Sequence, residues 1–193
     1  MRKSALRFLV ALALFGGAGI ANASIIYDLN RTIGAGSAVG FIETDGTLGF
    51  LSSANITNWE LTLTSANLSG GSPRTIDFAT SINTAVQGPG GLLANPDALV
   101  FNFSTPSNFF LQGAFPNASF WGLGVANICN FGGPPCIGEY LGWNLSGTGA
   151  AEVVARSGNL SFATARIPEP ATLALMCLGL AGLGIARHRS QTR

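Results

Sequence analysis

Short apolar runs alternate with clusters of Gly, Pro, Asn and Ser along most of the chain, between two longer apolar stretches near its ends. Outside those two stretches, no window keeps the 3.6-residue period of an amphipathic helix, whereas several keep the two-residue period of a strand. In the clearest case Trp59, Leu61 and Leu63 alternate with polar residues, which predicts a strand with one buried face. The pattern therefore predicts an all-β domain.

An Asp-Gly pair is the most specific turn signal. Asp45 and Gly46 separate the runs 39–44 and 47–51, and this dipeptide is typical of a two-residue hairpin turn, so we predict that the two runs pair directly. Residues 79–86 are ambiguous. Further strands are predicted at 59–64, 75–78, 98–103, 108–115, 119–125, 138–143, 150–156 and 160–165. About nine or ten strands with turn signals at this spacing favour a two-sheet sandwich or a jelly-roll-like domain.

The N-terminal apolar stretch has the features of a signal peptide. Basic residues precede an apolar run over residues 8–20. Ala21 and Ala23 then form the small-x-small pattern that signal peptidase needs, so we expect cleavage before Ser24. The sequence therefore predicts a signal peptide over residues 1–23 and an exported protein.

The C-terminal region contains three elements in order, namely a Pro-Glu-Pro turn, an uncharged apolar run over residues 171–186 and a basic end. The residues that define the turn and the basic end are Pro168, Glu169, Pro170, Arg187 and Arg189. As a helix the apolar run would be about 24 Å long, short of the roughly 30 Å hydrocarbon core, which suits a temporary transmembrane anchor. The alternative, a buried core helix, would show a polar face, and this run shows none.

This arrangement resembles the PEP-CTERM sorting signal of exported proteins in Gram-negative bacteria, and the resemblance covers residues 167–193. It implies an inner-membrane intermediate whose basic end faces the cytoplasm, in agreement with the positive-inside tendency. It also implies recognition by an exosortase-type membrane enzyme that acts near the Pro-Glu-Pro turn. Delivery to the cell surface or extracellular matrix of a bacterium that makes exopolysaccharide would follow.

Residues 24–167 remain when both targeting segments are set aside, and this length is typical of one domain. They contain four arginines, eight acidic residues and no lysine, a formal charge of −4, although the whole chain carries +1. An acidic domain without a basic face would repel a phosphate backbone, so nucleic-acid binding is not expected.

Two cysteines in the domain predict a disulfide. Cys129 and Cys136 enclose a Gly- and Pro-rich loop, and in an oxidising location such a pair most simply closes a hairpin or loop. A metal site is a poor alternative because the predicted domain contains no histidine to complete it. Calcium binding around Glu43 and Asp45 lacks the acidic spacing of an EF-hand loop, and the turn already explains those residues. No metal and no other cofactor are expected.

The inventory of reactive side chains argues against catalysis. The only histidine, His188, lies beyond the C-terminal apolar run, which argues against a hydrolytic triad in the domain. The lack of lysine in residues 24–167 argues against Schiff-base chemistry. A carboxylate pair of the kind that glycosidases use is compatible with the composition, but nothing in the sequence brings two acids together. We therefore expect no enzymatic activity.

Four aromatic residues and one asparagine are the remaining candidates. Ring stacking on a sugar is the hypothesis and core packing the commoner alternative for Trp59, Trp121, Tyr140 and Trp143. Asn30 starts an Asn-x-Thr pattern with a nearby acid, Asp28, as bacterial glycosylation systems often require. The alternative is that Asn30 and Thr32 occupy one polar strand face.

Three functional hypotheses follow from these patterns. The first is a non-catalytic component of the cell surface or extracellular matrix, associated with exopolysaccharide or biofilm. The second, from a different class, is a glycan-binding, lectin-like module. The third is a carboxylate-dependent glycosidase. Expected partners are signal peptidase, an exosortase-type enzyme, the membrane in a transient contact, and exopolysaccharide.

Overall fold

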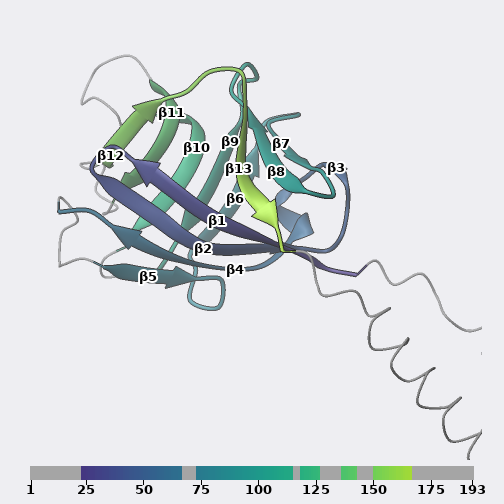
Figure 1. Ribbon diagram of the computed structural model, residues 1–193, viewed down its shortest axis with the longest axis horizontal. Coiled ribbons are helices and arrows are strands. Elements are labelled where there is room, and N and C mark those ends of the chain that lie inside the picture. Colours follow the sequence, from purple (N-terminus) through teal and green to yellow (C-terminus); the bar gives the residue numbers. More distant parts are fainter. Residues whose placement is uncertain (1–22, 67–72, 115–117, 127–135, 143–149, 167–193) are drawn as a thin grey trace, which may run out of the picture.

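The chain forms two antiparallel β-sheets in the computed structural model (Figure 1). The structure describes residues 23–66, 73–114, 118–126, 136–142 and 150–166. The eight-stranded sheet has the order β3-β7-β8-β13-β1-β2-β4-β5, and the five-stranded sheet has the order β12-β11-β10-β9-β6. In these ranges no helix is both long enough and apolar enough to traverse a bilayer. The predicted apolar runs 8–20 and 171–186 lie outside them.

Short strands account for most of the described residues. Their bounds are β1 (Ile25–Ile33), β2 (Gly36–Thr44), β3 (Gly49–Phe50), β4 (Ile56–Thr64), β5 (Arg74–Asp77), β6 (Asn83–Gln87), β7 (Leu92–Ala94), β8 (Ala98–Asn102), β9 (Asn108–Gln112), β10 (Phe120–Ala126), β11 (Cys136–Gly142), β12 (Ala150–Ala155) and β13 (Asn159–Ala165). A single 3₁₀ turn in the described ranges, η1 (Ser53–Asn55), precedes β4. The prediction of an all-β fold is confirmed, and the two sheets are consistent with a sandwich.

Most predicted strands coincide with observed ones, but the sequence pattern did not predict β1 and β7. Strand β1 nevertheless alternates regularly, because Tyr27, Leu29 and Ile33 are buried while Asp28 and Asn30 are exposed. Strand β6 falls in the region that was ambiguous from sequence. The predicted domain limits at residues 24 and 167 stay a prediction, because the segments beyond them lie outside the described residues.

The predicted hairpin around Asp45 and Gly46 is wrong. Strand β2 pairs with β1 and β4, and β3 pairs with β7 instead. The Asp45 side chain forms a local turn, in which its Oδ1 accepts the backbone N–H of Thr47 (2.9 Å) and its Oδ2 accepts Nδ2–H of Asn55 (3.1 Å). Among the described residues no cluster of three metal-ligating side chains occurs. The dipeptide therefore directs the chain to another strand rather than back onto β2.

The observed hairpin at the N-terminal end of the domain joins β1 to β2. Ile33 pairs with Gly36, so the turn consists of Gly34 and Ala35. Gly34 has a φ of 59°, in the left-handed region that glycine enters without the steric cost of a Cβ. The hairpin is long, with paired residues from Ile25 and Thr44 to the turn, and it places β1 in the interior of the eight-stranded sheet.

The inner faces of the two sheets share one apolar core. Trp59 and Phe101 belong to the eight-stranded sheet, Phe109 and Trp121 to the five-stranded sheet, and all four are fully buried. The rings of Phe109 and Trp121 meet edge to face with centroids 5.8 Å apart. Since each such side chain contributes about 1.5–3 kcal/mol on burial, this layer holds the sheets together.

Candidate functional site

The two ends of the described fold lie side by side. Strands β1 and β13 are antiparallel neighbours, with Tyr27 opposite Ala165. The start of β1 and the end of β13 are therefore at the same end of the eight-stranded sheet, at the lower right of the domain in Figure 1. Both segments that the sequence assigns to targeting are attached here, one before Ser24 and the other after Arg166. We call this end of the domain the junction.

Arg166 forms an ion pair with Asp28 at the junction. Its Nε–H is shared between the two carboxylate oxygens at 3.2 Å each, and Nη2 donates to Oδ1. These hydrogen bonds hold the pKa of the Asp28 carboxyl below its ordinary value and raise the pKa of the Arg166 guanidinium. The bidentate geometry gives the pair a defined orientation, although 54% of the Arg166 side chain and 51% of the Asp28 side chain are exposed.

Two backbone hydrogen bonds reinforce the same end of β13. The N–H of Arg166 donates to the carbonyl oxygen of Ile26 at 2.7 Å, which extends the ladder between β1 and β13 by one residue. The N–H of Ala165 donates to the carbonyl oxygen of Asp97, in the β7–β8 turn, also at 2.7 Å. The last described residues are thus fixed from two directions.

A hollow of about 310 Å³ lies beside the ion pair, lined by Ala23, Ser24, Ile25, Ile26 and Arg166. Ala23 and Ser24 are exposed, so the bond predicted for signal peptidase lies at the surface of the junction. The described lining of the hollow consists of aliphatic side chains, one hydroxyl and one guanidinium, so it contains no group suited to act as a general base. Ala21, the other residue of the predicted cleavage pattern, lies outside the described residues.

Glu139 of β11 forms a buried charge cluster between the sheets at the other end of β1. Arg31 of β1 donates through Nε to Oε1 at 3.0 Å and through Nη2 to Oε2 at 2.8 Å. Arg156 adds an Nη2 bond to Oε2 at 3.0 Å, and Trp121 adds an Nε1 bond to Oε1 at 3.3 Å. The Glu139 side chain is 0% exposed. This cluster ties β1 to the five-stranded sheet.

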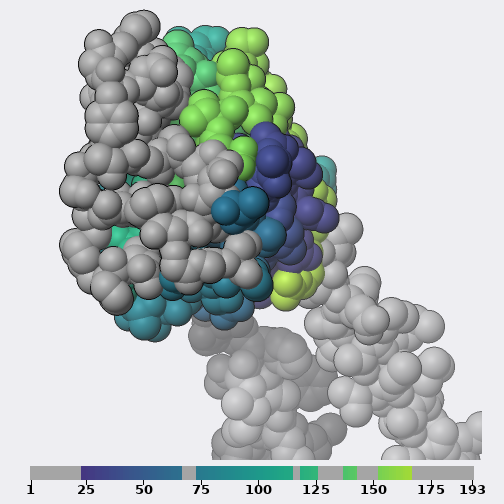
Figure 2. Space-filling view, turned by 90° about the vertical axis from the view of Figure 1, so that its left-hand side faces the viewer, coloured from purple at the N-terminus to yellow at the C-terminus, as the bar shows by residue number. Residues whose placement is uncertain are grey.

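A second carboxylate, Glu152 of β12, joins the sheets at the turn between β1 and β2. Its Oε2 accepts the backbone N–H of Ala35 at 3.0 Å, and its Oε1 accepts the hydroxyl of Ser65 at 2.7 Å. Figure 2 shows light-green residues of the β12 region beside purple residues of β1 and β2 on this face. Glu139 and Glu152 lie on adjacent strands, but both are engaged in cross-sheet bonds.

The three candidate aromatic residues in the described ranges are buried, as the core-packing alternative describes, and they do not form exposed platforms for a sugar. Trp59 is 0% exposed and donates Nε1–H to Thr84 Oγ1 at 2.8 Å, while Trp121 is 0% exposed and bound to Glu139. Tyr140 is 3% exposed, and burial raises the pKa of its hydroxyl. Their large apolar surfaces favour this placement. Trp143 lies outside the described residues.

Gly122 explains why the Tyr140 ring is buried on the outer side of its strand. The two residues are paired across β10 and β11, and a Cβ on Gly122 would lie 2.7 Å from Tyr140 Cε2. The ring therefore covers the bare glycine backbone of the neighbouring strand. Phe120 packs next to it, with ring centroids 6.2 Å apart. No local sequence signal predicts this pairing, because it depends on the register of β10 against β11.

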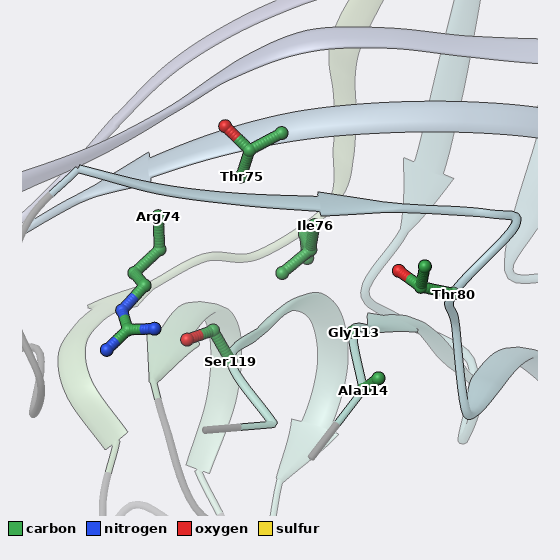
Figure 3. A pocket seen from close by; sticks show the side chains of 7 residues that line it. All are labelled: Arg74, Thr75, Ile76, Thr80, Gly113, Ala114 and Ser119. Atoms are coloured by element: carbon green, nitrogen blue, oxygen red, sulfur yellow. The ribbon is translucent and has the colours of Figure 1, made fainter. Parts of the chain in front are cut away.

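A smaller hollow of about 230 Å³ lies between β5 and the residues that flank β9 and β10 (Figure 3). Arg74 extends from β5 towards Ser119, and Ile76 points towards the chain at Gly113 (Figure 3). Arg74 and Ser119 both have interaction partners of their own. The side chains around the hollow therefore belong to the contact between the two sheets at the β5 edge.

The described residues include some, but not all, of the remaining candidate residues. The hairpin that Cys129 and Cys136 were expected to close is present, because β10 pairs with β11 and Ala126 lies opposite Cys136. Cys129 lies outside the described residues, so the disulfide stays a prediction. Asn30 is exposed on β1, on the same face as Asp28 and Thr32, as the polar-face alternative describes. Its glycosylation also stays a prediction.

The residues of the predicted sorting signal lie outside the described part of the chain. They are Pro168, Glu169, Pro170, Arg187 and Arg189. Comparison with protein families nevertheless identifies the segment, because residues 166–190 match the family model of the PEP-CTERM protein-sorting motif. The chain thus carries a C-terminal sorting motif of exported proteins, and the particular motif is PEP-CTERM.

No curated protein and no solved structure matches the chain. The family match begins at Arg166, the residue that closes the described fold through Asp28 and Ile26. The family match therefore overlaps the last described residue of the fold. The junction is the candidate functional site, because it is where the domain meets the segment that is to be processed.

Proposed function

We propose that the chain is an exported protein that its C-terminal helix holds in the inner membrane until an exosortase-type enzyme processes it near Pro168–Pro170. The observation that carries this proposal is the PEP-CTERM match over residues 166–190. Export with a membrane-anchored intermediate follows from the motif. The start of β1 and the end of β13, to which the two targeting segments are joined in the sequence, lie at one end of the domain, and this is compatible with that route.

Signal peptidase would release the other end of the chain before Ser24. The exposure of Ala23 and Ser24 supports access to this bond. After export, an oxidising compartment would favour the Cys129–Cys136 disulfide across the β10–β11 hairpin. The two-sheet fold would then be the mature domain, a single sandwich located at the cell surface or in the extracellular matrix of a Gram-negative bacterium.

We propose a non-catalytic role for this domain, in association with exopolysaccharide. The described carboxylates with polar partners support it, because they serve structural contacts. Glu139 and Glu152 join the sheets, Asp45 and Asp77 form turns, and Asp28 binds Arg166. The described aromatic candidates are buried, so they give no support to the alternative of glycan binding by ring stacking.

Replacement of both prolines of the motif tests the sorting role. In pulse-chase labelling of the exporting bacterium, we expect Pro168→Ala with Pro170→Ala to accumulate in the membrane fraction with the tail attached. The matched control is Pro73→Ala with Pro106→Ala, since both of these prolines are exposed in the domain. Processing and surface delivery of the motif variant at the wild-type rate would refute the proposal.

A further inference from the structure

We infer that the Arg166–Asp28 ion pair slows processing of the tail by fixing how much free chain separates the folded domain from the membrane. This inference rests on the proposed function, because it concerns the same processing step. Arg166 and Asp28 are positioning residues in this scheme, and the chemistry belongs to the processing enzyme.

The C-terminal end of β13 is held by contacts to two other segments. Arg166 is bound through its backbone to Ile26 and through its side chain to Asp28, both in β1. Ala165 is bound to Asp97 in a different turn. Release of the end of β13 therefore requires the loss of contacts to two separate segments.

Few residues lie between the folded domain and the predicted membrane helix, and we call them the tether. Residues 167–170 separate Arg166 from the predicted helix at 171, and even fully extended they reach only about 13–14 Å. The junction must therefore lie close to the membrane surface while the tail is inserted. A membrane enzyme that acts near Pro168–Pro170 has to fit between the junction and the membrane surface. If residues 164–166 detach from the sheet, the tether becomes about 10 Å longer, and the distance between the folded domain and the membrane can increase by the same amount.

The ion pair influences this detachment more than it influences global folding. About half of each side chain is exposed, and exposed pairs contribute little to the stability of a whole domain. The end of a strand, however, opens locally more readily than the whole domain unfolds, so a modest interaction there changes the detached population several-fold. The pair thus keeps the tether short and the motif poorly accessible for most of the time.

Removal of the pair tests this inference in the full-length exported chain. We expect Asp28→Asn and Arg166→Gln each to accelerate loss of the tail about two- to fivefold in pulse-chase labelling, without a marked change in thermal midpoint. Amide hydrogen exchange at residues 164–166 should accelerate by a similar factor. The matched control is Asp77→Asn, which removes a carboxylate that bonds Thr80 beside the edge strand β5 and should leave both rates unchanged.

A longer linker provides the second arm. Insertion of Gly-Ser-Gly between Arg166 and Ile167 should accelerate processing as Asp28→Asn does, and the two changes together should add little. Exchange of the charges, Asp28→Arg with Arg166→Asp, should restore slow processing.

The outcomes separate this inference from the proposed function. Unchanged processing in Asp28→Asn overturns the inference, and so does unchanged hydrogen exchange at residues 164–166. A wild-type chain whose tail is never removed would instead overturn the proposed function.

Discussion

Glu139→Gln is expected to destabilise the domain strongly, because it removes one charge from a buried cluster and leaves the others. The carboxylate is fully buried and accepts bonds from Arg31, Arg156 and Trp121. Glutamine is nearly the same size, but its NH₂ group would face guanidinium donors in place of an oxygen. Breaking a buried ion pair on one side typically costs about 3–5 kcal/mol, and we expect a loss of that size here.

Guanidinium chloride unfolding of the processed protein, followed by far-UV circular dichroism, measures this loss. With an m-value of roughly 4 kcal/mol/M for a domain of this size, the midpoint should fall by about 1 M. Asp28→Asn is the matched control, because it also removes the carboxylate of an arginine pair, and its half-exposed site predicts a much smaller shift.

A loss below about 1 kcal/mol in Glu139→Gln would refute the reasoning, because it would mean that the cluster is hydrated or easily rearranged. A triple variant sharpens the test. Replacement of Arg31 and Arg156 by methionine together with Glu139→Leu removes all three charges, and it should recover most of the lost stability. If the triple variant does not recover the lost stability, the three charged residues contribute to the free energy of unfolding by more than neutralising one another.

Three further outcomes are expected. Trp59→Ala should cost about 3–5 kcal/mol in the same unfolding assay, because it empties a fully buried site and removes the bond to Thr84, whereas Trp59→Phe should cost less. Gly124→Ala should destabilise by about 1–3 kcal/mol, because Gly124 has a φ of 119° and a Cβ there would lie 2.2 Å from the carbonyl oxygen of Ser107; an unchanged denaturation midpoint would contradict this. The lowered pKa of Asp28 means that its ion pair stabilises the fold above the unfolded-state pKa of about 3.9, and this contribution disappears as the pH falls through the folded-state pKa. An NMR titration of the Asp28 carboxyl should show that depressed midpoint in the wild type and a normal one in Arg166→Gln.

Contiguous signals were sufficient for the class of fold and for the tail. The alternation of Trp59, Leu61 and Leu63 with polar residues predicted β4 because burial on one sheet face imposes a two-residue period. The Pro-Glu-Pro turn, apolar run and basic end were recognisable because all three occur within one short segment. Neither prediction required knowledge of which distant segments meet.

Strand pairing was the part that local signals did not determine. Asp45 and Gly46 do form a turn, but a turn dipeptide does not specify that the flanking runs become partners. Strand β2 pairs with β1 instead, whose apolar and polar positions alternate just as clearly. The choice depends on the packing of the whole inner face, which a short window does not contain.

The charge cluster and the junction are also products of tertiary structure. Arg31 and Glu139 are 108 positions apart, yet each occupies an inward position of an otherwise apolar alternation. Charged residues at two such positions are the signal that sequence reasoning missed, because buried opposite charges require each other. The proximity of Arg166 to Asp28 likewise follows only from the β1–β13 register.

The central place of β13 has a consequence for the order of events during export. Translocation delivers residues from the N-terminus onwards, so β13 emerges after every other described strand. It fits between β8 and β1, and until it arrives both of those strands expose an open edge in the middle of the sheet. In the proposed export route the domain would therefore close only when its last strand has cleared the translocation channel, as the apolar run 171–186 reaches the membrane. Completion of the eight-stranded sheet and insertion of the C-terminal apolar run into the bilayer would then be nearly simultaneous.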